Sequence, residues 1–107
     1  MRPRTGRWLS AAACAAALAL PGTGQAATHT IRIEGMQYVP ATLTVRRGDR
    51  VVWDNRDVVP HTATAKGKFD SGNIATGRSW SHVMGKAGRF DYDCTFHPGM
   101  KASLVVQ

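Results

Sequence analysis

Cysteine and long apolar runs are both scarce in this sequence of 107 residues. Cys14 and Cys94 are the only cysteines, so the chain is not a disulfide-rich small scaffold. The longest apolar stretch, residues 9–20, has 12 residues, whereas a helix needs about 20 to span a bilayer. No segment repeats its apolar residues with the 3.6-residue period of an amphipathic helix. These absences argue against a disulfide scaffold, a helical membrane protein and a helical fold.

The first 26 residues have the three parts of a secretory signal peptide. Three arginines form a positive start, residues 9–20 form the apolar centre, and small or polar residues follow up to Ala26. We expect cleavage after Ala26, export to the periplasm and no membrane insertion after cleavage. The alternatives are a retained anchor and a lipoprotein signal that ends at Cys14. The second is disfavoured because Ala11 stands where such a signal prefers leucine.

Removal of this segment changes the composition of the chain that remains. It takes away Cys14 and three arginines, which leaves Cys94 as the one cysteine and 11 Lys plus Arg against 7 Asp plus Glu. The net charge falls from +7 to +4, and the charges are scattered, with Arg46-Arg47 as the longest cluster. We therefore expect no nucleic-acid binding. The remaining 81 residues, 27–107, are predicted to form a single domain, which we expect to be a monomer.

Short extended segments alternate with turn residues along this domain. Gly or Pro separates the segments at short intervals, and the clearest of them are residues 28–33, 42–45, 50–53 and 80–83. Several short strands with frequent turns are typical of an all-β sandwich. In such a sandwich we expect Trp53 to point inward and Met36 and Met84 to pack as well. His29 is expected to be exposed near the new N-terminus.

Residues 94–100, Cys-Thr-Phe-His-Pro-Gly-Met, offer a thiol, an imidazole and a thioether in one short stretch. Strand-like runs lead into it and out of it, so a tight loop can fold Cys94, His97 and Met100 around one point. Thiolate and thioether are soft donors that suit Cu(I) and tolerate Cu(II), and imidazole suits both states. Zinc would gain little from a methionine. The loop therefore predicts a copper site, although each residue alone would more often be an ordinary core or surface residue.

Three donors do not complete such a site, and the sequence has four histidines from which to choose another. His61 is the best candidate because it follows Pro60 and opens the strand-like residues 61–65, where a ligand can face a loop from elsewhere. His82 lies in an alternating strand without a partner nearby in the sequence, and we do not expect it to be a ligand. Two histidines, one cysteine and a weak methionine are the donors of a type 1 (blue) copper site. The predicted ligands of one copper ion are therefore His61, Cys94, His97 and Met100.

These motifs resemble those of the small blue-copper proteins of the cupredoxin family, and the short loop is more similar to amicyanin-like members than to plastocyanin-like ones. The resemblance runs from Ile31 to Val106 and includes Pro60-His61 and residues 94–100. It implies a cupredoxin-type Greek-key β-sandwich. Many family members place Asn directly after the first histidine ligand, where it hydrogen-bonds to the loop that carries the cysteine. This chain has Thr62 there, and the sequence leaves open whether its shorter hydroxyl group makes the same contact.

A copper ion held by four protein donors has no open position for a substrate, so we expect an electron carrier and not an enzyme. The chain is predicted to shuttle single electrons, through Cu(I) and Cu(II), between a redox protein donor and acceptor that the sequence does not identify. Its positive charge favours a partner with an acidic surface. One alternative is a periplasmic copper-binding or delivery protein without a carrier role, although methionine- or histidine-rich tracts are missing. The other is a metal-free sandwich that acts as a binding module.

Overall fold

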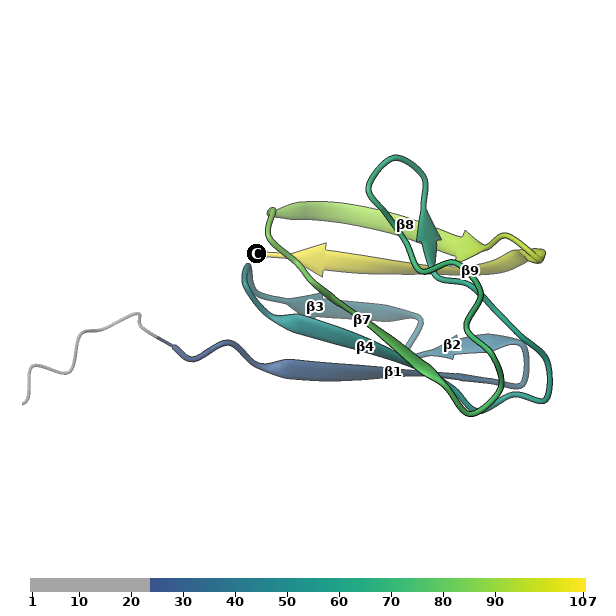
Figure 1. Cartoon of the computed structure of the whole chain (residues 1–107). Helices are drawn as coiled ribbons and strands as arrows, with labels where there is room; N and C mark the ends of the chain where they lie inside the picture. Colours follow the sequence, from purple (N-terminus) through teal and green to yellow (C-terminus); the bar gives the residue numbers. More distant parts are fainter. Residues whose placement is uncertain (1–23) are drawn as a thin grey trace, which may run out of the picture.

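The computed structural model describes residues 24–107. Within this range nine strands form two sheets that lie face to face (Figure 1). The all-β sandwich expected from the sequence is therefore confirmed. The predicted signal peptide, residues 1–26, lies outside the described residues except for its last three. The described part contains no helix of a length and apolarity that could cross a membrane.

The first sheet has four strands in the order β2-β1-β4-β7. Its strands are β1 (Thr28–Glu34), β2 (Gln37–Val39), β4 (Arg50–Asn55) and β7 (Ser79–Val83). The two central strands, β1 and β4, are parallel, and their register places Thr28 opposite Arg50 and Ile33 opposite Asn55. Both strands therefore begin at one end of the sandwich and finish at the other. β2 and β7 pair antiparallel to them at the two edges.

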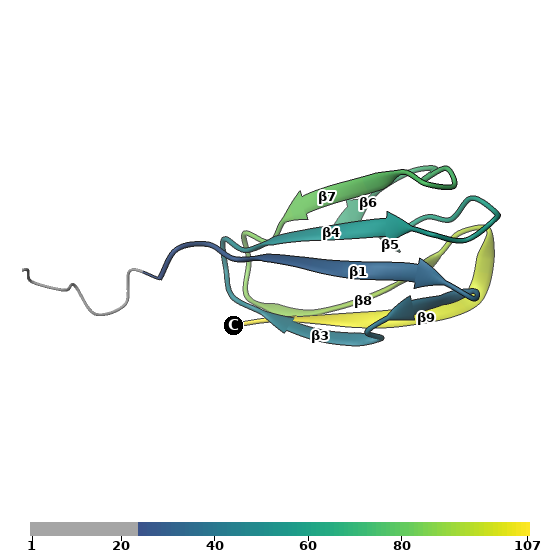
Figure 2. The ribbon, with the colours of Figure 1, turned by 90° about the horizontal axis from the view of Figure 1, so that it is seen from below.

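The second sheet has five strands in the order β3-β9-β8-β5-β6. Its strands are β3 (Thr42–Val45), β5 (Thr64–Ala65), β6 (Phe69–Asp70), β8 (Gly88–Cys94) and β9 (His97–Val106). β9, the last strand of the chain, lies between β3 and β8 (Figure 2). It is parallel to β3 and antiparallel to β8. The hairpin of β8 and β9 is the part of this sheet that presents the predicted metal loop.

The strand boundaries depart from the sequence prediction around the predicted ligands. β9 begins at His97 and not at residue 101, because Cys94 pairs directly with His97 across a two-residue turn. β5 has only two residues, and His61 instead forms an isolated bridge with Ile74. The short strands β2 and β6 were not predicted, since two or three residues are too few to show an alternating pattern. The loop is thus tighter than expected.

The core lies between the two sheets and is built from alternate residues of each strand. In β4, Val51 and Trp53 are fully buried, as predicted for the tryptophan. The Trp53 ring meets the Tyr92 ring edge-on, with 5.6 Å between their centroids. Tyr92 and Cys94 are the inward residues of β8, which follows from the two-residue alternation of a strand. The core packing of β8 therefore turns the cysteine side chain into the sandwich.

A two-residue turn joins β1 to β2 at one end of the sandwich. Gly35 and Met36 both have a φ of 62°, the left-handed conformation that a type I′ hairpin turn requires at both central positions. Glycine adopts it freely, whereas a non-glycine residue rarely does. Met36 is 43% exposed, so the prediction that it packs in the core is wrong, while Met84 is buried as predicted.

Candidate metal centre

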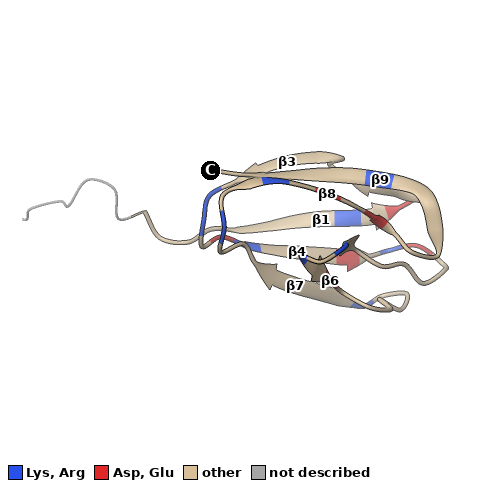
Figure 3. Ribbon diagram, turned by 90° about the horizontal axis from the view of Figure 1, so that it is seen from above, with Lys and Arg blue, Asp and Glu red and all other residues tan. Residues whose placement is uncertain are grey.

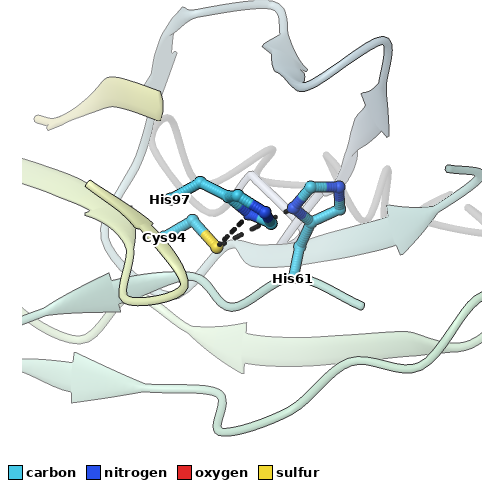
Figure 4. Close-up of side chains that lie close together, drawn as sticks. All are labelled: His61, Cys94 and His97. Atoms are coloured by element: carbon cyan, nitrogen blue, oxygen red, sulfur yellow. Dashed lines mark hydrogen bonds between the residues drawn. The ribbon is translucent and has the colours of Figure 1, made fainter. Parts of the chain in front are cut away.

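Three of the predicted ligands lie together at one end of the sandwich. Each of His61, Cys94 and His97 offers one possible ligand atom, and these three atoms all lie within 4.8 Å of one another. The Sγ atom of Cys94 is 3.8 Å from Nδ1 of His61 and 3.6 Å from Nδ1 of His97. Figure 4 shows both imidazole rings directed toward the sulfur from different segments of the chain. Two nitrogen atoms and one sulfur atom therefore face the same small volume.

Burial differs between the predicted ligands. His61 and Cys94 are fully buried, and Met100 is 6% exposed. Met100 belongs to the inward-facing residues of β9, which alternate with exposed or partly buried ones. His97 is only partly buried and stands next to Phe96, which is 51% exposed. Of the four predicted ligands, His97 thus lies closest to solvent.

The distances and the chemistry of this cluster both fit a copper ion. Bonds from Cys sulfur and His nitrogen to zinc, an ion of similar size, are about 2.3 and 2.0 Å, so a sulfur and a nitrogen on one such ion with near-tetrahedral angles are about 3.5 Å apart. The separations of 3.6 and 3.8 Å from Cys94 Sγ to the two histidine nitrogens lie close to that value. Thiolate with imidazole, and a thioether near by in the sequence, is the donor chemistry of copper. Copper is therefore the metal that the residues fit, as predicted.

Asp57 sets the orientation of the His61 ring, a role that was not predicted from the sequence. Nε2 of His61 donates a hydrogen bond of 2.8 Å to Oδ2 of Asp57, and this partner assigns the proton to Nε2. Nδ1 then keeps its lone pair, which faces Cys94. The spacing of four residues between Asp57 and His61 was the only signal in the sequence that could have suggested this pair.

The same carboxylate also holds the turn between β1 and β2. Backbone N–H groups of Gly35 and Met36 donate to the two Asp57 oxygens at 2.8 and 2.9 Å. The hydrogen bond from Met36, followed by those from Gly35 and His61, keeps the pKa of Asp57 below its usual value. Asp57 is therefore ionised at neutral pH and joins a strained turn to the candidate ligand.

Asn55 holds the loop that carries Asp57 and leads to His61. Asn55 is fully buried at the end of β4. Its Nδ2 donates to the carbonyl groups of Val59 and Ile74 at 3.0 and 2.8 Å, and its Oδ1 accepts the backbone N–H of Asp57 at 2.9 Å. One side chain thus fixes this loop at two points against the strand and also binds Ile74, the bridge partner of His61.

Thr62 connects the His61 segment to the cysteine loop. Its Oγ1 accepts the backbone N–H of Thr95 at 2.9 Å, and its own N–H lies 3.3 Å from Cys94 Sγ. The question that the sequence left open is answered, because the shorter hydroxyl group does reach the loop that carries the cysteine. The hydroxyl group of Tyr38 donates to the Thr62 carbonyl, and burial raises the pKa of Tyr38 far above its usual value. Tyr38 therefore stays neutral and keeps its proton for this hydrogen bond.

The two remaining histidines of the sequence lie outside the cluster. His82 belongs to β7 and stacks on Trp80, with 5.4 Å between the ring centroids and 13° between the planes. His29 was expected to be exposed, but only 27% of its side chain is accessible. Its Nε2 lies 2.9 Å from Oδ2 of Asp49, and this contact explains the burial. Neither residue is placed to join Cys94.

Comparisons with known families and relatives agree with this geometry. A family model described as a cupredoxin-like domain matches residues 7–106. Amicyanin from Paracoccus versutus is 29% identical over 83 residues, and amicyanin from Paracoccus denitrificans is 32% identical over 87 residues. Each of these alignments covers 72% of this chain and 63% of the relative. The matched part thus spans less than two thirds of the length of either relative.

Solved structures show the same architecture. The reduced Cu(I) form of an amicyanin variant superposes with a TM-score of 0.70 at 29% identity, covering 75% of this chain and 82% of that chain. A purple cupredoxin from Nitrosopumilus maritimus gives a TM-score of 0.71 at 29% identity, covering 74% of this chain and 99% of that chain. The cupredoxin-type sandwich implied by the sequence resemblance is therefore confirmed. The domain bounds 27–107 stay a prediction.

Proposed function

Because the chain belongs to the cupredoxin-like domain family, we propose that it is a blue-copper protein that carries single electrons between redox partners in the periplasm. The convergence of Cys94 Sγ with Nδ1 of His61 and of His97 is the observation that carries this proposal. We assign these residues as ligands of one copper ion, with buried Met100 as a weak fourth donor. When bound, copper supplies a one-electron couple between Cu(I) and Cu(II). The periplasmic location is inferred from the signal-like residues 1–26.

The protein itself holds the donor side chains in position. Asp57 fixes the His61 ring, and the N–H of Thr62 contacts the Cys94 sulfur. Thr62 also ties the cysteine loop through the N–H of Thr95. Donors held in this way move little when the charge of the metal changes, which is what fast electron exchange requires. With four protein donors assigned, no open position remains for a substrate, and this favours a carrier over an enzyme.

The proposal is tested by colour and by voltammetry of the copper-loaded protein. Cys94→Ser should abolish the intense visible absorption band, because a hydroxyl group cannot replace the thiolate that makes the charge-transfer bond to copper. His82→Ala, a histidine outside the cluster, is the matched control and should keep the band. A reversible one-electron wave without loss of copper on reduction distinguishes a carrier from a delivery protein. An unchanged band in Cys94→Ser would show that the assignment is wrong.

Electrons are proposed to leave through His97. Its Nδ1 faces Cys94, so the opposite edge of the partly buried ring is directed away from the cluster. Three exposed apolar side chains flank the site, and we call them the apolar rim: Met36, Val58 and Phe96, with 43, 90 and 51% exposure. The backbone of Met36 is hydrogen-bonded to Asp57, and Val58 directly follows Asp57 in the sequence. Phe96 directly precedes His97. Electron-transfer contacts are small and transient, which suits a rim of this size.

Charge should act on the encounter rather than on the docked contact. Lys and Arg are interspersed with Asp and Glu over the ribbon (Figure 3), and the chain after Ala26 carries a net +4. Attraction to an acidic partner should therefore fade as salt rises. Phe96→Asp is expected to slow electron transfer to an anionic redox partner even at high ionic strength, measured by stopped-flow. The control is Lys86→Asp, far from the rim in sequence, which should slow transfer at low salt only. Equal rates for Phe96→Asp and the parent at high salt would place the exit elsewhere.

A further inference from the structure

Asp49 is a buried carboxylate at the end of the sandwich opposite the metal cluster. It directly precedes β4 and is 5% exposed. Its Oδ1 accepts the backbone N–H of Ala27 at 2.9 Å, and its Oδ2 accepts the N–H of Arg46 at 3.0 Å and faces Nε2 of His29 at 2.9 Å. The Arg46 hydrogen bond, followed by those of Ala27 and His29, lowers the pKa of Asp49 to about 2. Asp49 is therefore a negative charge at neutral pH, and one of its acceptor atoms is directed at the backbone nitrogen of Ala27.

Ala27 is also the residue that directly follows the predicted signal-peptide cut. We propose that cleavage after Ala26 turns the nitrogen bonded to Asp49 into a terminal ammonium group, so that processing creates a salt bridge that the precursor lacks. In the hydrolysis, water adds across the Ala26–Ala27 peptide bond. The C–N bond breaks, the released leader keeps a carboxylate at Ala26, and the Ala27 amine takes up a proton. The inference rests on the export that forms part of the proposed function.

The backbone already holds Ala27 in the position that this salt bridge needs. The Ala27 carbonyl accepts the N–H of Arg50 at 2.9 Å, and Thr28 is the first residue paired with β4. Ala27 itself is exposed, whereas Asp49 is buried. The new ammonium group would therefore keep access to water on one side and meet a fixed carboxylate on the other. A charge-assisted hydrogen bond of this kind is stronger than the bond from a neutral peptide N–H.

The other side chains close to this carboxylate are one imidazole and two arginines. His29 of β1 shares Oδ2 of Asp49, and Arg46 lies three residues before it. Arg50 of β4 is adjacent in sequence, but its guanidinium group donates to Ser81 Oγ of β7 at 3.1 Å. Among residues 24–107, His29 is the one side chain within hydrogen-bond distance of the Asp49 carboxylate. An ammonium group at Ala27 would thus supply the carboxylate with a full positive charge at 2.9 Å.

The experiment uses the product obtained when the full 107-residue chain is expressed and exported. Intact mass should show that the product begins at Ala27. An NMR titration of its α-amino group should give a pKa above the usual value of about 8. Asp49→Asn should bring that pKa back to the usual value. Glu34→Gln removes one charge at the other end of β1 and serves as the matched control, which should leave the pKa raised.

Stability provides an independent measurement. A group with a raised folded-state pKa contributes stability below its unfolded pKa and loses it as pH rises through the folded value. Between pH 7 and 10 the melting temperature of the parent should therefore fall toward that of Asp49→Asn. The control Glu34→Gln keeps the salt bridge, so its melting temperature should fall in parallel with that of the parent. If Asp49→Asn does not fold, the salt bridge is tested by the α-amino pKa of the parent alone, which should lie above the usual value.

The outcomes separate this inference from the proposed function. A product that begins at another residue, or an α-amino pKa at the usual value, would overturn the salt bridge whatever the colour of the protein. A raised pKa in a product that begins at Ala27 would support it, even if the copper band were absent and the carrier function had failed.

Discussion

The two ends of the sandwich use the same arrangement of groups for different purposes. Asp49 precedes β4 and Asp57 follows it, so one carboxylate lies at each end of a single strand. Each carboxylate faces Nε2 of one histidine and accepts two backbone N–H groups, of which at least one comes from a distant segment. At one end the histidine is His29, and at the other it is His61. Asp49 ties the start of β1 to the start of β4, and Asp57 ties the turn after β1 to the loop after β4.

The difference lies in the surroundings of the two imidazole rings. The side chain of His61 is fully buried, and its second ring nitrogen faces Cys94 at 3.8 Å, whereas 27% of the His29 side chain is exposed. A carboxylate–histidine pair is therefore a general way to fasten a loop to this sheet. It becomes part of the candidate metal centre only where the chain brings a thiol to the other ring nitrogen.

Removal of each histidine should give the largest difference between the two ends of the sandwich. His61→Ala should prevent formation of the native copper site and lower the free energy of unfolding of the metal-free protein by about 2–4 kcal/mol, because it leaves a cavity and deprives Asp57 of a donor. His29→Ala should cost less than about 1 kcal/mol, because the pair is partly solvated. Copper titration and urea unfolding measure the two effects. Equal losses in the two variants would show that the ends do not differ in this way.

Neutralising each carboxylate should give a smaller difference between the two ends, in copper affinity and reduction potential. Asp57→Asn should weaken copper binding by about 10- to 100-fold, since partners of ligating histidines have effects of this size. It should also raise the reduction potential, because a less basic His61 stabilises Cu(II) less well. Asp49→Asn should leave copper affinity and potential unchanged. Competitive titration and voltammetry decide, and a shift of the potential in Asp49→Asn would contradict the separation of the two ends.

Acid unfolding should give the smallest effect. The folded-state pKa of Asp49 is lowered from 3.8 to about 2, so its carboxylate stabilises the fold above pH 3.8 and loses that contribution as pH falls toward 2. The pKa of Asp57 is lowered as well, so the sign is the same at the metal end. Urea midpoints of the metal-free parent and of Asp49→Asn should therefore converge between pH 4 and 2. A difference that stays constant over this range would show that the charge of Asp49 is not what stabilises its end.

The core strands and the ligand loop could be predicted from the sequence because their signals are local. Alternation places Trp53 in the core, and the Cys-x2-His-x2-Met spacing places three donor types within seven residues of sequence. Both patterns lie within a few residues. The short strands β2 and β6 carry no such signal, and their pairing depends on neighbours distant in sequence.

Most hydrogen bonds that position the candidate ligands join residues far apart in the sequence, so they could not be predicted. Asp57 acts through the turn residues Gly35 and Met36, which lie 22 and 21 positions away in the chain. Met36 was expected in the core because it is apolar, yet the geometry of a two-residue hairpin turn exposes it. Thr62 reaches Thr95 across 33 positions. Contacts of this range follow from the sheet topology and are not visible in a single stretch of sequence.

The last strand of the chain closes the second sheet. Val106 is paired on one side with Val45 of β3 and on the other with Gly88 of β8. During synthesis, β3 therefore emerges long before the strand that must lie beside it. Contacts between distant segments form slowly, and the nascent chain cannot complete its sandwich until β9 has left the ribosome. If the chain is exported as proposed, that delay keeps the polypeptide open during the interval in which a secretory channel engages it.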